Sequence, residues 1–183
     1  PESLFDEHRR AWADIWEKGG IELATDDLAL QQTTNATLYY LMMSTRSDWL
    51  HSTLVPSTIA ASAPYPHGYY GTTFWDQDTF MVPPLMVFYP SIASNLLQNR
   101  LYQLPAYKVN AAAFGLKGAY VPWEVGGTGG FARDNRINHI EIHVTADVAL
   151  LIKQYHQLTQ NTSALRELYP LLEAVSDFVV SRI

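Results

Sequence analysis

Two aromatic–acid pairs, Trp75-Asp76 and Trp123-Glu124, are the residues of this 183-residue chain whose types most clearly predict chemistry. An indole can cover the apolar C–H face of a sugar ring, and a carboxylate can accept hydrogen bonds from two hydroxyl groups at once. The pairs therefore indicate a carbohydrate site. The residues alone leave another interpretation open: a core tryptophan beside a helix-capping aspartate in the first pair, and a packed tryptophan beside a solvated glutamate in the second.

A second acid, Asp78, follows Asp76 closely enough to raise the question of a catalytic carboxylate pair. Inverting glycosidases hold their two carboxyl groups about 6.5–9.5 Å apart across one sugar. Residues two apart on a helix point in different directions, so both cannot face the same sugar. We therefore expect Asp76 to face a sugar and Asp78 to cap the helix that follows.

His139, His143 and Asp147 have the i, i+4, i+8 spacing of one helical stripe, which can hold a metal ion. The stretch HIEIH differs from the metal-binding pattern H-E-x-x-H, because its glutamate is in the wrong place. We therefore expect no metal and no cofactor, and we expect these side chains, His143 included, to line a cavity that binds substrate.

The glycine run GGTGG at 126–130 has the composition of a phosphate-binding loop. It lacks both the preceding strand and the lysine that such loops carry. We therefore expect these glycines to form a hinge or to allow close approach of the backbone to a neighbour.

Helical periodicity dominates the chain, and no segment shows a convincing strand pattern. Glycine and proline mark most of the expected helix ends, and an Asn138–Glu141 capping box is expected to open the sixth helix. Pro83-Pro84 should kink or delay the third helix, and Pro170 should kink or restart the last. The expected helices run up to Gly19-Gly20, from Asp26 or Asp27 to about Arg46, over Asp78–Tyr89, Pro90–Leu104 and Pro105–Gly115, from Asn138 to about Leu158, and from about Ser163 onward.

Two long irregular segments, 47–73 and 116–136, interrupt this helical scaffold. The first is too long for a simple connection, which is typical of a binding or active-site loop. The aromatic–acid pairs lie at the end of the first segment and within the second. The sequence therefore predicts an all-α chain, a single domain over 1–183, with a site at one end of a helical array.

Composition excludes several classes of function. The net charge is −6 and the basic residues form no stripe, so we expect no nucleic acid partner. No apolar run reaches the ~18 residues of a membrane span, so we expect no membrane association. Cysteine is absent, which excludes disulfides and leaves the cellular compartment open.

Three motifs are specific in their order and spacing: F-W-D with a proline shortly after it, then G-x-K-G-A, then P-W-E. The stretches to compare with known families are HRRAWADIWEKGGIEL, YYGTTFWDQDTFMVPPLMVFYP, NLLQNRLYQLPAYKVNAAAFGLKGAYVPWE and IEIHVTADVALLIKQYHQLT. These four stretches resemble glycoside hydrolase family 65, which contains maltose and kojibiose phosphorylases, acid trehalases and the glucosidase of glucosylgalactosylhydroxylysine.

The resemblance implies an incomplete (α/α)6 toroid, about half of the barrel, from the N-terminal part of a catalytic domain that cleaves α-glucosides with inversion. In the family the W-D pair holds the glucose of the cleaved subsite, which implies this role for Trp75 and Asp76. The family's general acid is a glutamate in a motif like P-D-E-Y-H, expected downstream of Ile183. The remainder of the protein, or a partner chain, would then complete the barrel.

The resemblance leaves the reaction open among three alternatives. The sequence FWDQD is more similar to the hydrolases, since the phosphorylases tend to have FWDTE. The loop after P-W-E departs from the family pattern, so the acceptor is not defined. An α-glucosidase is the leading interpretation, a disaccharide phosphorylase of the same fold is the second, and a noncatalytic sugar-binding or structural relative is the third.

Overall fold

The computed structural model describes residues 2–54, 71–133 and 136–183. Most of the predicted binding loop at 47–73 therefore lies outside the described residues. In chain order the elements are α1 (Glu2–Gly19), α2 (Leu28–Met43), β1 (Thr73–Phe74), the π-helix η2 (Gln77–Met81), α3 (Val82–Phe88), α4 (Pro90–Tyr102), α5 (Leu104–Ala113), β2 (Glu124–Val125), α6 (Arg136–Ile140), α7 (His143–Thr159) and α8 (Thr162–Arg182).

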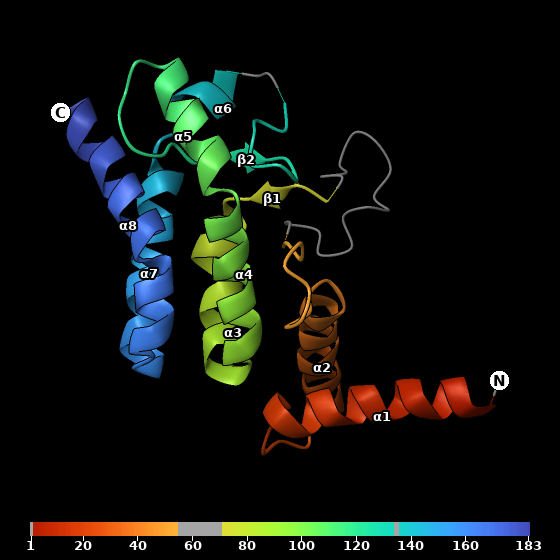
Figure 1. The fold of residues 1–183 in the computed structure, drawn as a ribbon. Helices are drawn as coiled ribbons and strands as arrows, with labels where there is room; N and C mark the ends of the chain where they lie inside the picture. Colours follow the sequence, from red (N-terminus) through yellow and green to blue (C-terminus); the bar gives the residue numbers. More distant parts are fainter. Residues whose placement is uncertain (1, 55–70, 134–135) are drawn as a thin grey trace.

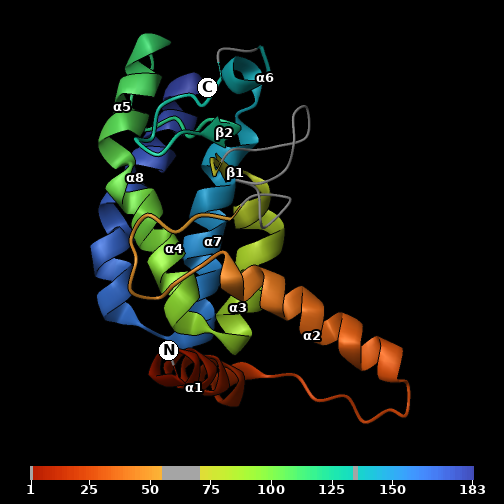
Figure 2. The same cartoon turned by 90° about the vertical axis from the view of Figure 1, so that its right-hand side faces the viewer.

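Helices α3, α4, α7 and α8 form the centre of the molecule, in two hairpins that pack side by side (Figures 1 and 2). The residues that face inward between them are large and aliphatic, and they form one continuous core. Its fully buried members include Val82, Leu85, Leu96, Leu97, Val148, Leu151, Ile152, Leu168 and Leu171.

Local sequence signals explain where these helices begin. Proline occupies the first turn of α3, α4 and α5, where its missing N–H removes no helical hydrogen bond. The expected helix over Asp78–Tyr89 is π-helical from Gln77 to Met81 and α-helical from Val82 to Phe88, with Pro83-Pro84 in the first turn of the α-helical part. The side chains of Asp27 and Asn161 cap α2 and α8 by accepting hydrogen bonds from Leu30 and Ala164.

The two short strands, β1 and β2, pair antiparallel at one end of the array, near α5 and α6 (Figure 1). Thr73 pairs with Val125 and Phe74 with Glu124. The expectation of a chain without strands was therefore wrong. A two-residue strand has too few residues for an alternating pattern, so the period of the sequence could not reveal it.

Three local predictions differ from the structure. Asn138 lies within α6 rather than capping a longer helix, and α7 begins at His143 without a side-chain cap. Helix α8 continues through Pro170, with no restart. Pro170 and Arg166 are both exposed, so the carbonyl group that loses its hydrogen bond faces water. The apolar spacing in the second expected helix also predicts that Leu28 faces inward, but Leu28 is 68% exposed.

Helices α1 and α2 lie at the opposite end from the sheet, with α1 running across the end of α2 (Figure 1). Trp12 packs against Tyr39 with ring centroids 4.8 Å apart, and Gly19 approaches Tyr89 closely. Across the described ranges, no helix is both long enough and apolar enough to span a membrane.

Candidate functional site

The sheet brings the two aromatic–acid pairs together. Trp75 directly follows β1 and Trp123 directly precedes β2, so antiparallel pairing places the two residues opposite each other at the same end of the strand pair. Their ring centroids are 5.0 Å apart at an interplanar angle of 38°. The imidazole of His143 is almost perpendicular to both indoles, with ring centroids 5.1 Å from Trp75 and 5.6 Å from Trp123. The three half-buried rings form what we call the aromatic triad.

Asp76 lies beside the aromatic triad, at the entry to η2. Its side chain makes no capping hydrogen bond, so the helix-cap interpretation of this residue does not hold. Its Oδ2 atom is buried and has no hydrogen-bond partner within the described part of the chain, and the same is true of the indole Nε1 of Trp75. Burial raises the pKa of Asp76. A buried carboxylate oxygen and an indole N–H are thus left as an acceptor and a donor next to an aromatic surface.

Glu124 is not the solvated residue that the alternative interpretation of its pair requires, since it is only 4% exposed. Its carboxylate accepts a hydrogen bond of 2.9 Å from the Thr72 hydroxyl and lies 3.3 Å from the guanidinium of Arg133. Its backbone N–H donates to the side chain of Asn138 at 2.8 Å. Glu124 therefore anchors the segments on both sides of the sheet.

Asp78 is an ion-pair partner rather than a helix cap. Its carboxylate forms a two-pronged ion pair with Arg100, and both side chains are fully buried. The predicted capping role of Asp78 was therefore wrong. In η2 the wider turn directs Asp78 toward α4 and not toward the first turn of the helix. Burial alone would lower the pKa of Arg100, but the Asp78 carboxylate more than offsets this and raises the pKa.

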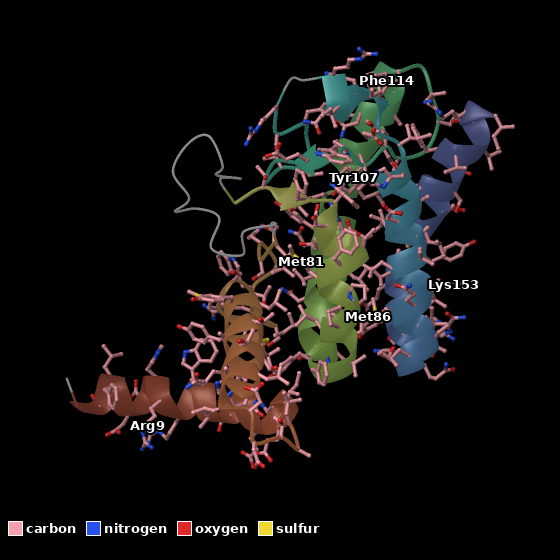
Figure 3. All side chains as sticks on the ribbon, turned by 180° about the vertical axis from the view of Figure 1, so that it is seen from behind. Arg9, Met81, Met86, Tyr107, Phe114 and Lys153 are labelled. Carbon is pink, nitrogen blue, oxygen red and sulfur yellow. The ribbon has the colours of Figure 1, made fainter. Side chains whose placement is uncertain are left out.

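The Asp78–Arg100 pair continues into a chain of hydrogen bonds that the sequence did not reveal. Arg100 donates to the Tyr107 hydroxyl at 3.0 Å, Tyr107 donates to Gln103, and Gln103 donates to the carbonyl of Gly126 at 3.4 Å. Tyr107 lies toward the sheet end of the helices, above Met81 and Met86 (Figure 3). The network joins η2, which follows Asp76, to the loop that follows Trp123-Glu124.

The glycine run serves close approach, as predicted. Gly129 has a φ of +89°, and a Cβ atom there would lie 2.8 Å from that of Ala106 and 3.0 Å from that of Gln103. The Gly129 carbonyl accepts a hydrogen bond from Asn110. The absence of side chains therefore lets this loop lie against α5.

Of the three residues predicted to share one helical stripe, His139, His143 and Asp147, only the last two are in contact. The Nδ1 atom of His143 lies 2.6 Å from Oδ2 of Asp147, while His139 is on α6 and packs against Phe131 and Phe114. The break between α6 and α7 separates them. Within the described ranges, no cluster of three or more acidic, histidine or cysteine side chains could hold a metal ion.

Two grooves in the structure lie away from the aromatic triad. One of about 760 Å³ lies between α1 and α2 and is lined partly by Trp16 and Gln31. An apolar groove of about 340 Å³ lies between α2 and α3, beside Leu38 and Phe88. Neither groove contains the aromatic–acid pairs. These two grooves of the described residues therefore lie away from the side chains that predict a sugar site.

Known proteins resemble the chain over almost its whole length. It is 36% identical to a kojibiose hydrolase from Mucilaginibacter mallensis, over 100% of this chain and 26% of the relative. It is 34% identical to a kojibiose phosphorylase from Halothermothrix orenii, over 86% of this chain and 21% of the relative. The chain therefore spans about a quarter of the length of these curated relatives.

Fold comparison agrees with the sequence relatives. A solved structure described as "Putative kojibiose phosphorylase from human microbiome" superposes with a TM-score of 0.85 at 18% identity, over 99% of this chain and 23% of that one. The family model for the glycosyl hydrolase family 65 central catalytic domain matches residues 34–183, which include the aromatic triad and Asp76. The chain therefore belongs to glycosyl hydrolase family 65.

Proposed function

We propose that this chain supplies the glucose-binding wall of an inverting α-glucoside-cleaving enzyme. The observation that carries the proposal is the aromatic triad beside Asp76, where an indole N–H and a carboxylate oxygen are buried without partners among the described residues. Trp75 and Trp123 offer apolar surface to a sugar ring, and Asp76 offers a hydrogen-bond acceptor to its hydroxyl groups. His143 and Glu124 complete the proposed substrate-binding set, Glu124 mainly by anchoring the loop that carries Trp123.

The same proposal extends to the architecture. The support is that α3–α4 and α7–α8 are two packed helical hairpins, and an (α/α)6 toroid is built from such hairpins. We propose that the chain forms about half of such a toroid, and that further protein, in the same polypeptide or in a partner, completes the barrel and supplies the general acid. The relatives support this proposal because each extends far beyond the part that matches this chain.

The proposed reaction is hydrolysis, with phosphorolysis as the second candidate. The F-W-D-Q-D sequence favours hydrolysis through its resemblance to the hydrolases of the family. Sequence identity does not distinguish hydrolysis from phosphorolysis, because the chain is 36% identical to a kojibiose hydrolase and 34% identical to a kojibiose phosphorylase. Cleavage of an α-glucoside without phosphate supports a hydrolase, whereas cleavage that depends on phosphate supports a phosphorylase.

The binding role is tested in the protein at its full natural length, by measuring kcat/KM on a panel of α-linked glucose disaccharides. We expect Asp76→Asn to fold normally and to lose about 2–4 kcal/mol of transition-state binding, because it loses a charged partner of substrate hydroxyl groups. Asp177→Asn, the same change at an exposed site on α8, is the matched control and should leave the rate unchanged. Wild-type kinetics in Asp76→Asn would overturn the assignment. Binding without turnover in the wild-type protein would instead support a noncatalytic sugar-binding relative.

A further inference from the structure

The imidazole of His143, one ring of the aromatic triad, is hydrogen-bonded to the side chain of Asp147. No motif in the sequence identifies Asp147 as a site residue. Asp147 lies one helical turn further along α7, with its Oδ2 atom 2.6 Å from Nδ1 of His143. His143 is the first residue of α7 and Asp147 the fifth, so both belong to the same helix. The contact therefore belongs to a rigid element and not to a loop.

This contact determines which nitrogen of the imidazole is free. A carboxylate only accepts hydrogen bonds, so Nδ1 of His143 carries a proton and donates it to Asp147. The other nitrogen, Nε2, lies 3.7 Å from the nearest Glu141 carboxylate oxygen, which is beyond hydrogen-bonding distance. The side chain of His143 remains 39% exposed, so Nε2 stays accessible to a ligand.

The orientation of the ring also matters to the two indoles. His143 lies almost perpendicular to both, at interplanar angles of 89° to Trp75 and 87° to Trp123. Edge-to-face contacts of this kind are favourable only over a limited range of ring orientations. A change in the imidazole orientation would therefore disturb both tryptophans, which come from different loops.

The start of α7 is fixed independently of Asp147. The Tyr120 hydroxyl lies 2.8 Å from the backbone carbonyls of Asn138 and Glu141, and burial raises the pKa of Tyr120 to about 12. The backbone of His143 thus has its own support, and the side-chain orientation is the part left for Asp147 to determine.

We propose that Asp147 is a positioning residue for the sugar site. It orients the imidazole of His143 so that the ring packs perpendicular to Trp75 and Trp123 and Nε2 is presented to a substrate hydroxyl group as a hydrogen-bonding partner. This inference rests on the proposed sugar-binding function. Asp147 itself touches no substrate and acts only through His143.

The test compares Asp147→Ala, Asp147→Asn and the exposed control Asp177→Asn in the protein at its full natural length. The first readout requires no sugar: the near-ultraviolet circular dichroism of the Trp75–Trp123 pair. The second readout is the affinity for an α-linked glucose disaccharide. We expect Asp147→Ala to change the dichroism and to weaken binding about tenfold, the equivalent of one buried hydrogen bond. The amide oxygen of Asp147→Asn can still accept a hydrogen bond from Nδ1 of His143. This variant should therefore keep most of the wild-type dichroism and most of the wild-type affinity.

The outcomes separate the inference from the function on which it rests. Unchanged dichroism in Asp147→Ala overturns the positioning role, whatever the protein binds. If Asp147→Asn is as impaired as Asp147→Ala, the hydrogen bond is not what positions the ring, and the proposal fails. If the wild-type protein binds no glucoside while the dichroism changes as expected, the sugar-binding function fails and the positioning of the indoles stands. If Asp147→Ala does not fold, the comparison of Asp147→Asn with His143→Gln takes its place, with milder loss expected in Asp147→Asn and equal or greater loss counting against the proposal.

Discussion

The polar residues near the site are of two kinds. Some keep a hydrogen-bonding group available to a ligand, and others form hydrogen bonds or ion pairs within the protein. Within 2–54, 71–133 and 136–183, Asp76 and Trp75 keep buried polar atoms without partners, whereas Asp78, only two residues from Asp76, is paired with Arg100. Both aspartates follow the same tryptophan in the sequence, and residue type alone cannot distinguish them. What separates them is their place at the π-helix: Asp76 precedes it, whereas Asp78 lies within it and its carboxylate reaches Arg100 of α4.

The buried ion pair gives a first prediction about stability. Arg100→Met leaves the Asp78 carboxylate buried without a partner, so we expect a loss of about 3–5 kcal/mol in the free energy of unfolding. The double variant Asp78→Leu/Arg100→Met removes both charges and should recover most of that loss. Urea unfolding of the two variants measures this, and an equally unstable double variant would show that the charges are not the cause.

The second prediction concerns pH and Asp76. Burial raises the pKa of this carboxyl group above its ordinary value of 3.8, so the folded state holds the proton more tightly than the unfolded state does. The stabilising contribution of the protonated form is fully present below pH 3.8 and is lost as the pH rises through the folded-state pKa. Asp76→Asn should therefore raise the melting temperature at neutral pH and give no gain below pH 3.8. Thermal unfolding at both pH values checks this, and an equal gain at both would contradict the burial explanation.

At the scale of elements, the short sheet is the feature that assembles the site, and it is also the feature that the sequence concealed. Proline and aspartate signals predicted the starts of α2, α3 and α4, because capping chemistry acts within one turn. The aromatic–acid pairs were recognised by residue type. Their meeting depends on pairing between segments far apart in the sequence, and so do the two ends of the hydrogen-bond chain, Asp78–Arg100 and Gln103–Gly126. Such contacts leave no periodic signal in either segment.

Gly118 provides the prediction that belongs to this scale. Its φ is +75°, and a Cβ atom there would lie 2.2 Å from the backbone carbonyl oxygen of Ala174 in α8. The neighbouring Ala119 donates a hydrogen bond to the same carbonyl at 2.8 Å. Gly118→Ala should therefore push the 116–136 segment away from α8 and lower the free energy of unfolding by more than about 2 kcal/mol. Gly127→Ala is the matched control, since a Cβ atom at Gly127 meets nothing within 4 Å. Equal melting temperatures for the two variants would contradict the account.

At the scale of the whole molecule, α1 and α2 lie at the end opposite the sheet (Figure 1). They expose large apolar side chains there. The exposed residues at this end include Leu4, Phe5, Leu28, Leu30, Tyr39, Tyr40 and Met43. This surface continues into the apolar groove between α2 and α3.

The uncovered surface predicts how residues 1–183 behave when expressed alone. An apolar surface larger than the ~300–600 Å² typical of a monomer favours association. We therefore expect the isolated chain to self-associate with increasing concentration, and we expect lysine substitutions at Leu4 and Phe5 to reduce this. Sedimentation velocity over a range of concentrations measures the effect. A monodisperse monomer that unfolds cooperatively would show that the chain needs no further protein to cover it.

The pairing of β1 with β2 also limits how the length of this chain can change during evolution. Between the two strands the chain passes through η2, α3, α4 and α5, and one residue added to an α-helix rotates everything after it by about 100°. An insertion within α4 or α5 would therefore turn Trp123 away from Trp75, whereas one in the exposed 22–26 connection would leave both in place. Natural insertions and deletions among the relatives should accordingly be rare within these helices and common in the connection before α2.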